Sequence, residues 1–489
     1  MEEFDLVIRG GHLVGATCEG IADLGIRGSL IAAIGESLPR GVEEIDARGR
    51  LVLPGGIDSH CHIEQVTSTG LRTSDTFQSA TQSAAAGGTT TVIPFACQRR
   101  GQSPADVLAA YRKLAEGQAE VDYAFHLIMT DPTAEALAGL PALANQGYTS
   151  IKIYMTYEAL RLDDRQILDV LDAARREGLM VMIHAEGHDM IQWLTDRLIS
   201  SGRSEPRYHT VARHPLAERE ATHRAATMAE LVDANVLIVH VSGQGAIDEI
   251  ARARSSGRPI HAETCPQYLC LTATDLDRPG FEGAKCLCSP PPRDASHHAR
   301  VWQALAQGEI DVVSSDHSAF AYGGTEGKQW RGSSVPFNEI PQGVPGIELR
   351  MPLLFSEGVL QGRLTLRQFV DLTSANHARL YGLWPRKGVL VEGADADVAI
   401  WDPGLTRRVT TEILHDGLDY TPYEGRTLTG WPETVLCRGQ RVFEDGVLPT
   451  PSGRGTFLAC DRPFPQKSGN TIDRLISELF PNDSARRTA

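Results

Sequence analysis

Short apolar and β-branched runs alternate with stretches of helical length through the middle of the chain. Stretches such as Asp163–Glu177 and Leu216–Asp233 are rich in Ala, Leu and charged residues, which is typical of amphipathic helices. Eight strands alternating with helices predict an α/β fold, a (β/α)8 TIM-like barrel, although a doubly wound open sheet would give a similar pattern. The expected strands lie in the runs Leu51–Ile63, Thr89–Phe95, Tyr123–Met129, Ser150–Met155, Met180–Glu186, Val236–Ser242, Ile260–Cys265 and Asp311–His317.

Both ends of the chain show a different pattern, with short strands punctuated by glycine. Phe4–Arg50 and the two segments KGVLVEGADADVAIWDP and TVLCRGQRVFEDGVL are hairpin-like. We therefore expect residues 1–54 and 388–463 to form a small β-sandwich domain beside a catalytic barrel of residues 55–387. Residues 464–489 are expected to be a C-terminal tail with one short amphipathic piece, Thr471–Phe480.

Length, composition and charge narrow the class of protein. A chain of 489 residues is too long for one ordinary core, and 42% hydrophobic with 22% charged residues fits a folded soluble protein. The net charge of −15 argues against a broad basic face for nucleic acid. The start has no secretory pattern, no apolar run could span a membrane, and the nine cysteines form no CxxC pair. We therefore expect a cytoplasmic protein with free thiols and no membrane partner.

Ionisable side chains stand where the expected barrel strands end. His60 and His62 are two residues apart, so they share one face of their strand. Barrel enzymes place their active sites at the carboxyl ends of the strands, and only a closed barrel brings the first and eighth strands together. The convergence therefore favours the barrel over the open sheet. The residues concerned are His60, His62, Lys152, His184, His240 and Asp316.

These residue types indicate a metal site. Imidazoles and a carboxylate suit Zn²⁺, and the carboxylate also tolerates Mn²⁺. Four histidines and one aspartate are more ligands than one ion needs, but two ions that share a bridging ligand would use them all. Such a pair turns a bridging water into hydroxide. Lys152 is not explained by these ligand rules, because an ammonium group is a poor ligand.

The motifs GGIDSHCH, IKIYMTY, IHAE, VHVSG, ETCPQYL and SSDH resemble those of the amidohydrolase superfamily. Within it the chain resembles the D-hydantoinase/dihydropyrimidinase family, from Phe4 to about Leu458. The resemblance implies two zinc ions per subunit, bridged by Lys152 after its carboxylation by CO₂. It further implies a homotetramer. The implied ligands are His60, His62 and Asp316 on one ion, and His184 and His240 on the other.

The resemblance also implies an activity on a small cyclic amide substrate. A hydroxide between the two zinc ions would hydrolyse the ring of a hydantoin or dihydropyrimidine to an N-carbamoyl amino acid. Asp316 would shuttle the proton and Tyr157 would donate to the oxyanion. Ser289 matches the position whose backbone groups hold the substrate amide. Gln342 stands where the family has a substrate-binding Asn, which leaves the substrate open.

Other functions of the same fold remain as alternatives. They are an imidase, an allantoinase or dihydroorotase, and a non-catalytic assembly protein. Tyr157 argues against allantoinase and dihydroorotase, and the intact set of six candidate ligands argues against the non-catalytic protein.

Three loops are candidates for choosing or covering the substrate. Glu64–Ser74 and Tyr154–Leu162 are expected to choose it, with Leu71 and Leu160 as candidate apolar contacts. Phe320–Gln342 is either a lid or a surface excursion. Four further histidines are left outside the site: we expect His317 to point to the opposite face from Asp316, and His188, His209 and His261 to be structural or solvated.

Overall fold

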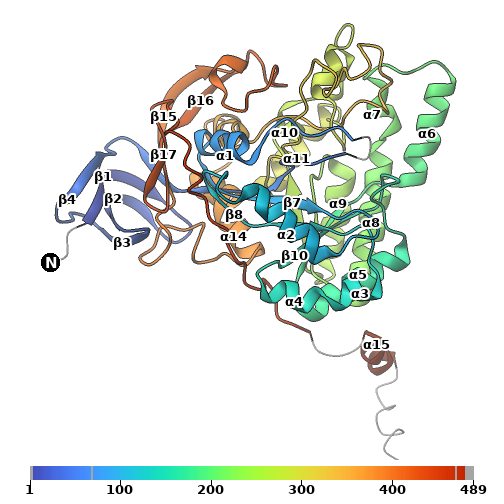
Figure 1. Ribbon diagram of the computed structural model, residues 1–489, viewed down its shortest axis with the longest axis horizontal. Helices are drawn as coiled ribbons and strands as arrows, with labels where there is room; N and C mark the ends of the chain where they lie inside the picture. Colours follow the sequence, from blue (N-terminus) through green and yellow to red (C-terminus); the bar gives the residue numbers. More distant parts are fainter. Residues whose placement is uncertain (1–3, 68–69, 468–470, 480–489) are drawn as a thin grey trace, which may run out of the picture.

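The computed structural model describes residues 4–67, 70–467 and 471–479, and its larger part is a ring of parallel strands surrounded by helices (Figure 1). Neighbouring strands of the ring pair in parallel, and the short strand β8 (Asp122–Tyr123) pairs beside β7. In order, the eight strands are β6 (Gly56–Cys61), β7 (Thr89–Cys97), β9 (His126–Ile128), β10 (Ser150–Tyr154), β11 (Met180–His184), β12 (Val236–Ile238), β13 (Ile260–Thr264) and β14 (Val312–Val313).

The first and last strands meet, so the sheet is a closed barrel. The backbone N–H of His62 donates to the carbonyl of His317 over 2.7 Å, and Cys61 forms a parallel bridge with the same residue. This contact confirms the barrel and excludes the open sheet. The run Leu51–Ile63 contains the expected first barrel strand and one further strand, because it divides at Gly55 into β5 (Leu51–Pro54) of the second sheet and β6 of the barrel.

Helices follow the barrel strands and cover their outer face (Figure 1). Helix α5 shows why: Asp163 caps its first turn, Gly178 ends it in the left-handed conformation at φ 68°, and Ile167, Val170 and Leu171 form its buried face. The helices are α1 (Phe77–Ala86), α2 (Pro104–Ala115), α3 (Ala134–Ala138), α4 (Leu140–Asn145), α5 (Asp164–Glu177), α6 (His188–Ser200), α7 (Tyr208–Ala212), α8 (Pro215–Val232), α9 (Gln244–Ser255), α10 (Gln267–Cys270), α11 (Ser296–Ala306), α12 (Arg350–Leu354), α13 (Leu366–Val370), α14 (Asn376–Leu380) and α15 (Thr471–Leu479).

The two termini together build a second, mostly antiparallel sheet beside the barrel (Figure 1). Strand β5 from the N-terminal part pairs antiparallel with β15 from the C-terminal part, with Leu53 opposite Ala399. This pairing confirms a β domain assembled from both ends. Its strands are β1 (Phe4–Val14), β2 (Glu19–Arg27), β3 (Leu30–Gly35), β4 (Gly41–Asp46), β5, β15 (Val398–Arg408), β16 (Thr427–Cys437) and β17 (Gln440–Glu444).

The expected tail is described only in part. Residues 464–467 and helix α15 belong to the described chain, whereas residues 468–470 and 480–489, including Phe480 of the expected amphipathic piece, lie outside it. None of the described helices combines the length and the apolar character that crossing a membrane requires.

Candidate active site

All six candidate ligands lie at the carboxyl ends of barrel strands, as barrel enzymes require. The strand-end positions place them around one mouth of the barrel, and five of the six residues are buried while His62 is half-buried. They are His60 in β6, His62 just after it, Lys152 in β10, His184 at the end of β11, His240 two residues after β12, and Asp316 three residues after β14.

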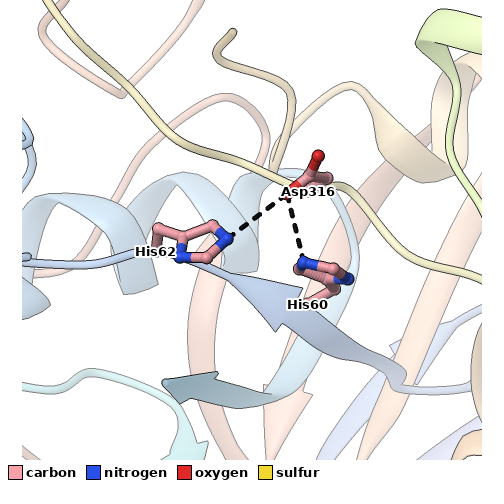
Figure 2. Close-up of side chains that lie close together, drawn as sticks. All are labelled: His60, His62 and Asp316. Carbon is pink, nitrogen blue, oxygen red and sulfur yellow. Dashed lines mark ion pairs between the residues drawn. The ribbon is translucent and has the colours of Figure 1, made fainter. Parts of the chain in front are cut away.

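His60, His62 and Asp316 form one cluster within this group (Figure 2). Asp316 Oδ1 lies 3.2 Å from His60 Nε2 and 3.4 Å from His62 Nε2. One donor atom from each residue lies within 4.8 Å of the others, so a single cation could contact all three. Burial alone would raise the pKa of Asp316, but the two imidazoles outweigh it and hold that pKa well below its usual range. Asp316 is therefore a carboxylate at neutral pH.

His184 and His240 form a second pair across the mouth. His240 Nε2 lies 2.8 Å from His184 Nδ1, and the two rings meet edge to face. Burial lowers the pKa of both imidazoles well below the usual value. Both rings are consequently neutral at neutral pH, which is the protonation state that a metal ligand needs.

Lys152 stands among these groups without a partner of its own. Its side chain is completely buried, and Nζ has no hydrogen-bond partner in the part of the chain that the structure describes. The ammonium lies over the rings of Phe95 and Tyr154, at 5.2 and 5.3 Å from their centroids. Burial lowers the pKa of Lys152 to about 8. An unpaired buried amine is costly, so the chemistry of this position is incomplete with the protein atoms alone.

Carboxylates behind the imidazoles fix their orientation. Glu263 Oε1 lies 2.5 Å from His60 Nδ1, and Glu186 Oε2 lies 2.7 Å from His184 Nε2. Each carboxylate accepts one ring N–H and leaves the other nitrogen facing the mouth. Glu263 and Glu186 were not predicted as functional residues, although Glu263 belongs to the ETCPQYL motif and Glu186 to IHAE.

The backbone is strained at three of the site residues. Tyr157, His240 and Asp316 have φ values of 68°, 40° and 50°, in the left-handed region that favours glycine. Such conformations cost about 1–3 kcal/mol each and persist where the surrounding structure enforces them, often at functional sites.

The predicted substrate-binding residues meet beside the ligands. The Tyr157 hydroxyl donates to Gln342 Oε1 over 3.1 Å, and the Ser289 hydroxyl donates to the same oxygen over 2.6 Å. The Arg213 guanidinium supplies a third donor at 3.1 Å. The Gln342 amide oxygen thus accepts three hydrogen bonds, which fix the orientation of that side chain.

One cavity of about 940 Å³ is lined both by five of the six candidate ligands and by the predicted substrate-binding residues. Both expected substrate loops reach it, through Gln65–Thr67 and Tyr157–Leu160, and so does Phe320–Gln342, the segment expected to be either a lid or a surface excursion. Leu160 lines this cavity, whereas Leu71 is not among its lining residues, and residues 68–69 of the first loop lie outside the described chain. The residues of this segment in the wall are Phe320, Trp330, Arg331 and Phe337–Gln342.

Comparison with known proteins assigns the family. A model of the amidohydrolase family matches residues 51–442. The D-hydantoinase of Rhizobium radiobacter is 41% identical over 446 residues, which cover 91% of this chain and 96% of the relative. The D-hydantoinase of Geobacillus stearothermophilus is 42% identical over 455 residues, which cover 92% of this chain and 96% of the relative. The crystal structure of dihydropyrimidinase from Brevibacillus agri matches with a TM-score of 0.91 at 39% identity, covering 94% of this chain and 99% of that one.

The chain belongs to the amidohydrolase family, in its hydantoinase/dihydropyrimidinase branch. The resemblance of the motifs is thereby confirmed. Which residues of this amidohydrolase hold a metal and which contact the substrate stay predictions.

Arg213 is a residue of this amidohydrolase site that sequence reasoning missed. It is buried just after α7, pairs with Glu186, donates to Gln342 and lies 4.8 Å from the centre of the Tyr157 ring. It therefore connects a carboxylate behind His184 with the predicted substrate-binding residues. No signal in the sequence marks it, because its partner Gln342 is 129 residues away.

Two of the histidines set aside earlier lie close to the site. His209 was expected to be structural or solvated, but it lines the cavity, and its Nε2 lies 3.0 Å from both Ser289 Oγ and the Cys288 carbonyl. His317 is completely buried, and its Nε2 lies 2.8 Å from Asp75. His317 thus has its own carboxylate partner and does not join the cluster of His60, His62 and Asp316.

Proposed function

We propose that this amidohydrolase opens the cyclic amide ring of hydantoins or dihydropyrimidines and releases N-carbamoyl amino acids. The observation that carries the proposal is the buried, unpartnered Nζ of Lys152 among four imidazoles and the Asp316 carboxylate. The D-hydantoinase and dihydropyrimidinase relatives support the substrate class. The donors gathered around Gln342 lie in the same cavity, where they can meet an amide ring.

We further propose that the site holds two zinc ions. His60, His62 and Asp316 would hold one ion, and His184 and His240 would hold the other. Lys152 would bridge them as a carbamate: its uncharged Nζ bonds to the carbon of CO₂ and loses one proton, which gives an anionic oxygen ligand. The unpartnered amine and the neutral, facing imidazoles fit this donor set. Bound zinc would polarise the attacking water and the scissile carbonyl.

The protein's own side chains then divide the work of ring opening. Asp316 is charged at neutral pH and lines the cavity, so it can accept a proton from the attacking water and return it to the leaving nitrogen. The Tyr157 hydroxyl already acts as a donor, to Gln342, and a substrate oxygen could take the place of that acceptor as negative charge develops. Ser289 and Gln342 would hold the amide of the ring.

A panel of substrates tests the proposal. The expected result is ring opening of hydantoin, phenylhydantoin or dihydrouracil by a preparation that contains about two zinc ions per subunit, the number that the ligand count supports. Exclusive opening of allantoin or succinimide would favour the allantoinase or imidase alternatives. A metal-free protein that opens none of these rings would favour a non-catalytic assembly protein. Sedimentation of the same preparation would test the homotetramer.

A further inference from the structure

Lys328 is a completely buried lysine that the proposed chemistry does not use. It belongs to the expected lid segment, and its Nζ donates three hydrogen bonds, all to backbone carbonyls. The acceptors are Leu287 at 3.1 Å, Pro341 at 3.0 Å and Gly343 at 2.7 Å. No carboxylate in the described chain pairs with it, so its charge is stabilised by peptide dipoles alone.

The three carbonyls belong to the two segments that carry the substrate-binding side chains. Pro341 and Gly343 flank Gln342, and Leu287 lies two residues before Ser289. The Gly343 N–H also donates to the Leu287 carbonyl, over 3.1 Å. Gly343, at φ 149°, packs so closely that a Cβ there would lie 2.4 Å from the Ser318 carbonyl oxygen. The short bond between Ser289 and Gln342 therefore lies beside a backbone junction at which Lys328 bonds to both segments.

Stability alone does not account for a charge at this position. Burying an ammonium costs several kcal/mol, and no carboxylate in the described chain offsets that cost at Lys328. A methionine would fill the same volume without that cost, but it could not donate to three carbonyls at once. The three donated bonds fix the relative position of two loops, which is the property that a substrate site needs.

We propose that Lys328 is a positioning residue for substrate binding, which holds the Gln342 turn against the Ser289 loop so that both side chains meet the amide of the ring. This inference rests on the proposed function and deepens it. Lys328 acts through the backbone of the two loops and does not touch the substrate, because all three of its hydrogen bonds go to carbonyls.

The protonation of Lys328 gives the inference a second readout. Burial lowers the pKa of Lys328 to about 7. Below that pH the ammonium offers three hydrogens to three carbonyls, and above it the amine offers two. The titratable groups that face it are Cys286, Cys288 and His209. Burial raises the pKa of Cys286 to about 11 and the pKa of Cys288 further, and it lowers that of His209 to about 3, so none of them titrates near pH 7.

The test compares Lys328→Met with the wild-type enzyme on hydantoin and several 5-substituted hydantoins at pH 6.5. We expect KM to rise about tenfold for every substituent, because the junction positions residues that contact the ring. The value of kcat should change little and the zinc content not at all, since neither depends on ring binding. Lys285→Met is the matched control, because Lys285 forms an ion pair with Glu282 close by in the chain and donates to neither loop.

Three outcomes would overturn the inference: an unchanged KM in Lys328→Met, an equal rise in Lys285→Met, or an undiminished effect of Lys328→Met in a Gln342→Ala background. If Lys328→Met does not fold, the pH profile of KM decides. The wild-type KM should then rise from pH 6 to pH 8 relative to that of Gln342→Ala, and parallel profiles would contradict a role through Gln342. A wild-type enzyme that opens no ring would instead contradict the proposed function.

Discussion

Two buried lysines at opposite ends of the barrel differ in what surrounds them. Lys387 lies where the barrel meets the second sheet, and its Nζ lies 2.6, 3.0 and 2.8 Å from carboxylate oxygens of Asp122, Asp395 and Asp397. Lys152 lies at the mouth and has no hydrogen-bond partner in the described chain. Burial disfavours the ammonium at both positions. The carboxylates outweigh burial and raise the pKa of Lys387, whereas burial lowers that of Lys152 to about 8.

The difference separates a lysine that supports the fold from one that needs a group the chain does not supply. At Lys387 the protein provides the opposite charges itself, and Arg438 and Thr90 bind two of the same carboxylates. At Lys152 the protein provides candidate metal-ligand side chains, but the described chain holds no hydrogen-bond acceptor for the amine. A buried charge without a partner is costly and therefore a good indicator of function.

The largest effect should follow from Lys152→Met. The bridge between the two metal sites would be lost, so we expect zinc and ring-opening activity to disappear together. The fold should remain, because the substitution removes an unpaired amine and keeps the volume of the side chain. Metal analysis, activity and a denaturation curve on one preparation check this. Full zinc occupancy in the variant would contradict the bridging role.

Lys387→Met should have the opposite effect. It would leave three buried carboxylates without their shared cation, and breaking a buried ion pair in this way costs about 3–5 kcal/mol. We expect guanidinium denaturation at a clearly lower concentration. At a temperature where the variant is folded, kcat/KM should stay within about twofold of the wild-type value, because distant sites without shared partners couple weakly. A variant that loses zinc but not stability would reverse the comparison.

The two ends of the barrel also differ in how far the sequence predicts them. The position of the candidate ligands at the mouth could be predicted, because each follows an apolar run and strand ends of a barrel converge. Residues that act through distant partners could not. Arg213 and Lys328 resemble surface cations in the sequence, and only the fold brings Arg213 to Gln342 or Lys328 to Leu287. The apolar pattern of Leu51–Ile63 does not by itself separate the two strands that it holds, although the domain boundary expected after residue 54 falls at their junction.

Tyr157→Phe, at the mouth of the barrel, should lower kcat without changing metal content or stability. Loss of one donor to an oxyanion lowers kcat by about 10²–10³-fold. The bond from Tyr157 to Gln342 would be lost too, but Ser289 and Arg213 still donate to that oxygen, so KM should change much less. Steady-state kinetics on hydantoin measure both parameters. An unchanged kcat would remove Tyr157 from the proposed role.

The smallest expected effect concerns Lys328. In the described chain it has three carbonyl partners, whereas Lys152 has no hydrogen-bond partner and Lys387 has three carboxylates. With a pKa of about 7 in the folded protein and an ordinary value of 10.5 when unfolded, Lys328 binds fewer protons in the folded state between these pH values. The free energy of unfolding of the wild type should therefore rise with pH in this window, by about 1 kcal/mol between pH 7 and pH 8 relative to Lys328→Met. Guanidinium denaturation of both proteins at the two pH values measures the difference. Cys286, Cys288 and His209 do not titrate in this window. A difference in unfolding free energy between the two proteins that is the same at both pH values would therefore mean that the carbonyl dipoles keep Lys328 charged. The junction would then be held equally at both pH values.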